Sequence, residues 1–121
     1  MILVDTSIWV DHLRSGNATL VELLNGADVL AHPWVTGELA LGGLRHRADV
    51  IRLLSGLPQA LVATADEVLS LIDAESLHSA GIGYVDAQLL AATRITSGSA
   101  LWTADKRLAA TAARLGVAHR P

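Results

Sequence analysis

The sequence predicts a single α/β domain of 121 residues, in which helices cover both faces of a central parallel sheet. Short runs of β-prone apolar residues alternate along the chain with longer segments whose apolar residues recur at helical spacing. Strands that alternate with helices are joined by right-handed crossovers, and such strands pair in parallel. No repeat, linker or low-complexity segment divides residues 1–121, and this length suits one domain with a substantial core.

The predicted strands begin with Ile2–Val4, an apolar run that ends at Asp5 and is followed by the hydroxyl pair Thr6 and Ser7. Asp5 is thereby placed at the carboxyl end of a parallel strand, the edge at which open α/β sheets bind their ligands. Helix capping is the alternative role for this carboxylate. Later apolar runs predict further strands at residues 29–31, 60–63 and 100–103, and residues 117–118 could add an edge strand.

Seven helices are predicted from apolar periodicity and from the turn and cap residues that bound it. Pro33 suits the first turn of the helix that carries Glu38. A glycine-flanked loop precedes Asp86, and the helix that follows is so rich in small and apolar residues that we expect it to be packed on most sides. The predicted helices occupy residues 7–14, 20–24, 33–41, 45–54, 64–80, 84–95 and 106–115.

The composition predicts a cytoplasmic protein whose apolar surface is partly covered by a partner. Hydrophobic residues make up 51% of the chain and the mean hydropathy is +0.41. No apolar stretch approaches the roughly 18 residues of a membrane span, and an acid stands where a signal peptide would be basic. The absence of cysteine excludes disulfides and thiolate sites. A net charge of −3 argues against non-specific coating of nucleic acid, but not against a nuclease that carries a cation.

Four carboxylates stand out by their placement, namely Asp5, Glu38, Asp86 and Asp105. Two follow predicted strands and two lie on helices that can face the same edge of the sheet. Two carboxylates about 4 Å apart repel each other by about 4 kcal/mol at an effective dielectric constant of 20. A cluster of them is therefore stable only when protonated or bridged by a cation. Oxygen ligands favour Mg²⁺ or Mn²⁺, ions that recruit substrate phosphates, so the pattern indicates phosphodiester or phosphoryl chemistry.

Across nearly its whole length the chain resembles the PIN-domain ribonucleases, and within them the VapC-type toxins of toxin–antitoxin pairs. One departure is Leu108, where such toxins often carry an aromatic residue. Four motifs carry the resemblance: Ile-Leu-Val-Asp-Thr-Ser at residues 2–7, Thr-Gly-Glu-Leu at 36–39 with Gly42 beyond, Asp-Ala-Gln-Leu-Leu-Ala-Ala at 86–92, and Thr-Ala-Asp at 103–105.

The resemblance implies a Mg²⁺-dependent endoribonuclease that is inhibited by a cognate antitoxin and forms a homodimer. It implies that Asp5 and Asp86 are the principal metal ligands and Asp105 a further ligand, with Glu38 holding a water molecule of the ion or a second ion. Three hydroxyls, those of Thr6, Ser7 and Thr103, could donate hydrogen bonds to these carboxylates, although capping or strand-end bonding is an equal alternative.

Other residues have less specific interpretations. Surface positions are expected for the five histidines, since no pair has zinc-helix spacing, and core packing for Trp9, Trp34 and Trp102. Candidate phosphate contacts, with a solvated helix face as the alternative, are Arg45, Arg47, Lys106 and Arg107.

Two other classes of protein remain open. A phosphoacceptor receiver module shares the length and the strand-end acids, but it needs an acid pair after the first strand, where this chain has only Asp5. A toxin-like fold used purely for binding is the second class, and the presence of all four acids argues against it.

Overall fold

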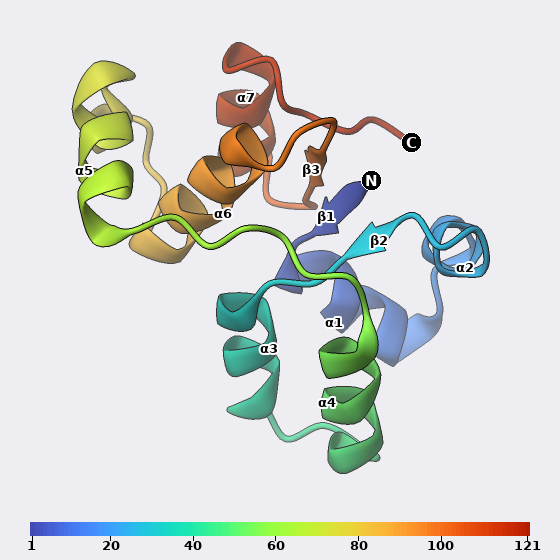
Figure 1. The fold of residues 1–121 in the computed structure, drawn as a ribbon. Helices are drawn as coiled ribbons and strands as arrows, with labels where there is room; N and C mark the ends of the chain where they lie inside the picture. The colour runs from blue at the N-terminus through green and yellow to red at the C-terminus, as the bar shows by residue number, and fades with distance from the viewer.

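The computed structural model describes residues 1–121 and contains a sheet of three parallel strands in the order β2-β1-β3. Strand β1 (Ile2–Val4) is central and pairs with β2 (Val29–Leu30) on one side and with β3 (Ala100–Trp102) on the other. Since β1 lies between two strands from later in the chain, its carboxyl end is flanked on both sides (Figure 1).

Helices lie on both sides of these strands. Figure 1 shows α5, α6 and α7 together on one side, and α1, α3 and α4 together on the other. The predicted class, an α/β fold with a parallel sheet between helices, is confirmed. The helices are α1 (Thr6–Ser15), α2 (Ala18–Asn25), α3 (Pro33–Ala40), α4 (Arg47–Gly56), α5 (Ala65–Ala74), the short 3-10 helix η1 (Leu77–Ser79), α6 (Tyr84–Ile95) and α7 (Lys106–Arg114).

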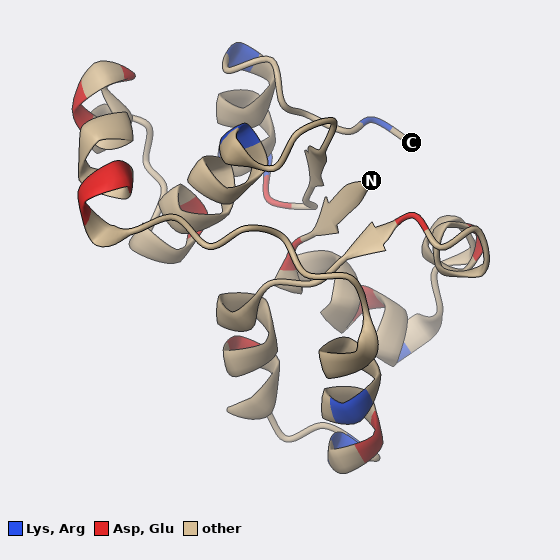
Figure 2. Cartoon of the chain, in the orientation of Figure 1, with Lys and Arg blue, Asp and Glu red and all other residues tan.

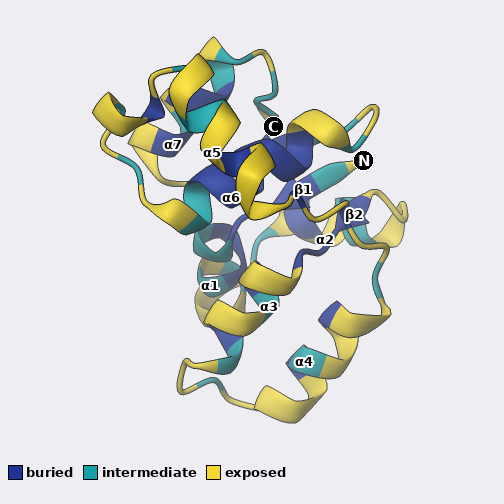
Figure 3. Cartoon of the chain, turned by 60° about the vertical axis from the view of Figure 1, so that its left-hand side comes forward, coloured by how far each residue is buried: buried dark blue, intermediate teal, exposed yellow.

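The core extends across the sheet and the inner faces of the helices, and α6 contributes its longest buried run. Leu3 and Val4 of β1 and Leu101 of β3 are almost fully buried. In α6 every residue from 87 to 93 is buried, as its apolar composition predicts. Figure 3 shows this concentration of buried residues in the strands and α6, whereas α4 is largely exposed. Helix α6 is therefore a fixed support for the side chains of its first turn.

Residues 60–63 do not form the predicted strand. Ala60 makes one sheet-like hydrogen bond, in which its N–H donates to the carbonyl of Ala31 at 2.9 Å. The N–H of Leu61 then donates to the hydroxyl of Thr96 beyond α6, and Leu61 is 58% exposed. The segment crosses from the edge of β2 toward α6 without continuing a ladder, so apolar composition alone overestimated its pairing.

Two further predictions were longer than the elements that form. The edge strand at residues 117–118 is reduced to a single parallel bridge between Ala118 and Leu101. The predicted helix at 64–80 ends at Ala74, because Ser76 adopts a left-handed conformation with φ 54° before η1 begins. Its start is well specified, since Thr64 and Glu67 form a reciprocal capping box.

None of the helices has both the length and the apolar character needed to cross a membrane.

Candidate active site

The four singled-out carboxylates gather at the carboxyl end of the sheet. Asp5 directly follows β1, Asp105 follows β3 by three residues, Glu38 lies on α3 and Asp86 lies in the first turn of α6. Figure 2 shows acidic segments at these four places, on elements that come from both sides of the sheet. The fold thus brings together residues that are up to 100 positions apart in the sequence.

The pKa of Asp86 depends on its burial and on the charges of the other three acids. Burial raises the pKa of its carboxyl, and the negative charges of Asp5, Asp105 and Glu38 raise that pKa further. The hydrogen bond that the carboxylate accepts from the N–H of Gly83 at 3.1 Å acts in the opposite direction and lowers it. The net raised pKa means that ionising Asp86 adds charge to a site that is already negative.

Asp5 is buried, with 6% of its surface exposed, and its side chain faces the sheet edge instead of capping α1. It occupies the position before the helix, but its carboxylate makes no capping bond. Oδ2 instead accepts hydrogen bonds from the hydroxyls of Ser7 and Thr103, each at 2.7 Å. The backbone N–H of Asp5 donates to the carbonyl of Trp102, which fixes the residue against β3.

The two hydroxyls are themselves oriented by backbone donors. The N–H of Ala104 donates to Ser7 Oγ and the N–H of Asp105 donates to Thr103 Oγ1, each at 3.0 Å. Since both hydroxyl hydrogens are directed at Asp5, the 3.3 Å contact between the hydroxyl oxygens has no hydrogen left to share. The loop after β3 thereby sets the orientation of the Asp5 carboxylate through two ordered hydroxyls.

The remaining acids are each held by a single donor. Glu38 Oε1 accepts from the hydroxyl of Thr6 at 2.6 Å, and Asp86 Oδ2 accepts from Gly83. Asp105 Oδ1 accepts from the N–H of Leu108 at 2.9 Å and thereby caps α7. Helix capping and site membership are therefore compatible for Asp105, since they use different oxygens.

Each of the four acids consequently has one oxygen bound to protein donors and a second oxygen without a protein hydrogen bond. The free oxygen of Asp5 is not among the buried unsatisfied atoms, so it reaches solvent. Each carboxylate of the site is therefore held through one oxygen, and its other oxygen is available to a ligand.

The carboxylates are not assembled as a ready ligand set. No group of three or more His, Asp or Glu side chains is arranged to hold one metal ion. The ligands expected from the sequence, Asp5, Asp86 and Asp105, are thus neighbours at one edge of the sheet and not a preformed cage.

Comparison with known proteins places this arrangement in a family. The family description "PIN domain" matches residues 2–114, which include all four acids. The chain belongs to the PIN-domain family. It is 50% identical over 118 residues to "Ribonuclease VapC32" from Mycobacterium tuberculosis strains CDC 1551 / Oshkosh and ATCC 25618 / H37Rv. These matches cover 98% of this chain and 95% of the relative. The resemblance drawn from the motifs is confirmed, and membership of this family replaces the receiver-type alternative.

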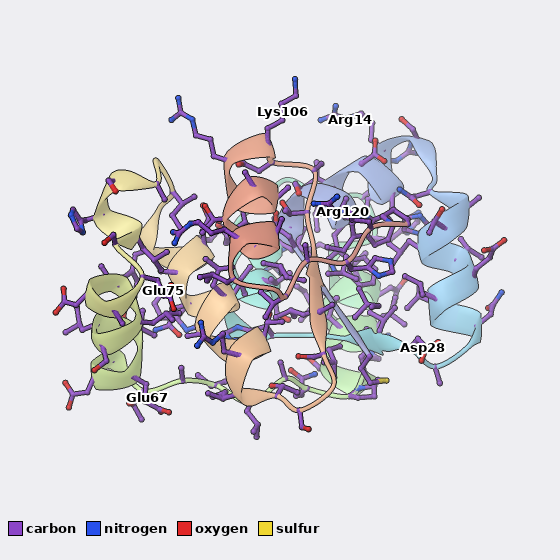
Figure 4. All side chains as sticks on the ribbon, turned by 90° about the horizontal axis from the view of Figure 1, so that it is seen from above. Arg14, Asp28, Glu67, Glu75, Lys106 and Arg120 are labelled. Carbon is purple, nitrogen blue, oxygen red and sulfur yellow. The ribbon has the colours of Figure 1, made fainter.

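Basic residues of the PIN domain lie around the site, not in it. Lys106 extends from the start of α7 into solvent (Figure 4). Arg107 packs over Gly81, where an added Cβ would lie 3.1 Å from Cδ and Nη1 of the arginine; the φ of +73° separately favours glycine at this position. Arg47 is engaged with the protein, because its Nε donates to the carbonyl of Ala40 at 2.7 Å, and Arg45 lines a hollow beside α1. Their contacts with phosphate remain predictions.

Two residues near the site, His32 and Trp34, differ from what the sequence indicated. His32 is fully buried instead of lying on the surface, and its Nδ1 caps α3 by accepting from the N–H of Trp34 at 3.0 Å. Burial lowers the pKa of this imidazole. Trp34 is 39% exposed, in contrast to Trp9 and Trp102, which are buried as predicted. No local signal in the sequence separates Trp34 from its neighbour Val35, which is fully buried in the same helical turn.

Proposed function

We propose that this PIN domain is a metal-dependent endoribonuclease that hydrolyses phosphodiester bonds in RNA. The observation that carries the proposal is that four carboxylates share one edge of the sheet, each with one oxygen held and one oxygen open. Burial and, to a smaller extent, the charges of Asp5, Asp105 and Glu38 raise the pKa of Asp86, and a divalent cation would offset both effects on the ionised carboxylate. The name of the M. tuberculosis relative supports RNA as the substrate.

Hard oxygen donors fit Mg²⁺, with Mn²⁺ as a substitute. Asp5, Asp86 and Asp105 would hold the ion through their open oxygens, and Glu38 would hold a water molecule or a second ion. When bound, the cation supplies Lewis acidity that lowers the pKa of a water nucleophile and neutralises charge on the phosphate.

The protein's own residues set the orientation of this chemistry. Ser7 and Thr103 fix the plane of the Asp5 carboxylate, and Thr6 holds Glu38 toward the first turn of α1. Because no lysine, arginine or histidine neutralises the acids by a direct ion pair, their charge stays available for a cation.

A cleavage assay tests this proposal. Purified protein is incubated with total RNA in Mg²⁺, in Mn²⁺ and in EDTA, and EDTA should abolish cleavage. Asp86→Asn should abolish cleavage in all three conditions, with Asp66→Asn on exposed α5 as the matched control that retains it. Cleavage that survives chelation, or that survives in Asp86→Asn, would overturn the metal mechanism.

We further propose that a cognate antitoxin neutralises the protein and that the free protein is a homodimer. Large apolar side chains remain exposed on and beside α1, α3 and α4, and Leu41 is 92% exposed. A hollow of about 650 Å³ between α1 and the start of α4 is lined by both apolar and basic residues, including Leu13, Leu44 and Arg45. Sedimentation at micromolar concentration tests the dimer, and a species of monomer mass alone would contradict it.

A further inference from the structure

The PIN domain exposes an aromatic pair that its packing does not require. The rings of Trp34 and Tyr84 contact each other edge to face, with centroids 5.7 Å apart and an interplanar angle of 65°. They are 39% and 43% exposed, whereas Trp9 and Trp102 are nearly fully buried. The chain has three Trp, one Tyr and no Phe, so this surface contact includes half of its large aromatic residues.

The pair lies on the two helices that carry site acids. Trp34 precedes Glu38 by four residues on α3, so the two side chains share a helix face about one turn apart. Tyr84 is the first residue of α6 and precedes Asp86 by two residues. The contact between the rings therefore bridges α3 and α6 beside the carboxylates.

The surroundings of the pair restrict its movement. The backbone N–H of Trp34 donates to the buried imidazole of His32, which anchors the first turn of α3. The hydroxyl of Tyr84 accepts from Nε2 of Gln88 at 3.1 Å, and Gln88 is only 3% exposed. The Tyr84 ring is therefore held in place, and the Trp34 ring packs against it, so ordering the pair when a ligand stacks on it costs little conformational entropy.

Because the protein is negatively charged, a contact with RNA that does not depend on phosphate charge would contribute to binding. With a net charge of −3 and acids at the site, the protein alone attracts the RNA backbone weakly, and a cation at the acids would add only a local phosphate contact. Stacking of bases on aromatic rings is independent of phosphate charge and tolerant of sequence, because every base has a π-face.

We propose that Trp34 and Tyr84 form a stacking site for a base of single-stranded RNA next to the phosphodiester that is cleaved. The proposal rests on the RNA hydrolysis proposed above. Duplex RNA is excluded from this contact because its bases are already stacked and paired, so the site selects unpaired loops and ends. Tyr84 also lines a mostly apolar cavity of about 180 Å³ with Leu77 and Ile82, which gives space beside its ring.

Steady-state cleavage of a single-stranded oligoribonucleotide tests the stacking site. Trp34→Leu keeps apolar volume but removes the π-face, and it should raise KM by roughly 5- to 150-fold while kcat changes much less. Trp34→Phe should restore most of the affinity. Val21→Ala, which trims an exposed apolar residue on distant α2, is the matched control and should leave KM unchanged. An unchanged KM in Trp34→Leu would overturn the proposal.

A substrate that lacks one base next to the cleaved bond provides the second measurement. Loss of that base should raise the KM of the wild-type protein but not that of Trp34→Leu, since the variant has no stacking contact left to lose. Additive effects of the variant and the missing base would contradict direct stacking.

Binding without cleavage separates this inference from the nuclease proposal. Titration of the protein with the same oligonucleotide in EDTA should quench tryptophan fluorescence in the wild type and not in Trp34→Leu. Quenching without cleavage in Mg²⁺ would retain the stacking site and reject the nuclease. Cleavage with unchanged KM in Trp34→Leu, together with weakened binding of the antitoxin, would assign the aromatic pair to the antitoxin instead.

Discussion

Thr6 donates its hydroxyl hydrogen to Oε1 of Glu38 over 2.6 Å, and this bond joins the first turn of α1 to the middle of α3. The two residues are 32 positions apart, yet each belongs to a helix that begins at the carboxyl end of a strand. The start of α1 therefore holds two acids, because Ser7 in the same turn holds Asp5.

Thr6→Val tests the contribution of this donor. Valine keeps the shape of threonine but cannot donate, so the Glu38 carboxylate loses its fixed orientation. We expect cleavage activity to fall about 10- to 100-fold, as is typical when a partner of a metal-site ligand is removed. Thr6→Ser should retain activity. Equal losses in the two variants would indicate that packing of the methyl group matters and not the hydrogen bond.

Asp86→Asn should stabilise the protein in the absence of divalent ions. Burial and three neighbouring acids raise the pKa of Asp86, so its carboxylate favours folding when protonated and opposes folding when ionised. The asparagine amide can still accept from Gly83. At about pH 7 we expect the free energy of unfolding to rise by about 0.5–2 kcal/mol, measured by urea denaturation in EDTA.

The same pair of proteins gives a pH control. The stabilising difference should shrink as the pH falls through the raised pKa of folded Asp86, and it should be absent below the unfolded pKa of about 3.9, where Asp86 is protonated in both the folded and unfolded states. A variant that is less stable than the wild type at neutral pH would show that the Asp86 charge is structural.

His32 should make the protein sensitive to mild acid. Burial lowers the pKa of this imidazole, and its neutral Nδ1 accepts the capping hydrogen bond of α3. A lowered folded pKa gives stability that is complete above the unfolded value of about 6.5 and is lost as the pH falls below it. His32→Asn retains a capping acceptor, so the variant's unfolding free energy should depend less on pH between about 6.5 and 5.

The control for this measurement is internal. Burial also lowers the pKa of His119, but that residue is present in both proteins and its contribution cancels in the difference. Identical pH slopes for wild type and His32→Asn would exclude His32 as the source.

Antitoxin inhibition should compete with Mg²⁺. A partner that covers apolar residues along α1 and α3 and directs an arginine or lysine toward Asp5, Glu38, Asp86 and Asp105 would occupy the position of the cation. The concentration of antitoxin peptide that halves cleavage should rise as Mg²⁺ is raised over about a hundredfold range. A peptide whose basic residues are replaced by alanine should inhibit weakly. Inhibition that is independent of Mg²⁺, with the alanine peptide still potent, would indicate simple steric occlusion.

Prediction from the sequence succeeded where one local pattern determined the element. The run Ile2–Val4 ending at Asp5 predicted both the central strand and the position of its acid, and the small apolar residues after Asp86 predicted a buried helix. For the hydroxyls of Thr6, Ser7 and Thr103 the sequence left bonding to carboxylates and ordinary capping or strand-end bonding as equal alternatives, and in the structure all three donate to carboxylates.

Prediction failed where tertiary contacts decide between similar patterns. Residues 60–63 have strand composition, but Thr96 takes the N–H that a neighbouring strand would have bound. His32 and Trp34 differ in burial although they are two positions apart, because the fold buries His32 and Val35 and leaves Trp34 on the outer side of the first turn of α3. The order of strands and the meeting of α3 with α6 could not be read from the periodicity of either segment.

The contact between Asp5 and Thr103 also has a consequence for synthesis of the chain on the ribosome. Asp5 is among the first residues to emerge, but the hydroxyl that orients it lies 98 positions later. Until β3 has left the exit tunnel, β1 lacks one of its two partners and the carboxylate lacks its fixed plane. A nascent chain that ends before β3 therefore carries Asp5, Glu38 and Asp86 without the hydroxyl that orients Asp5, so the site is completed only when translation is almost finished.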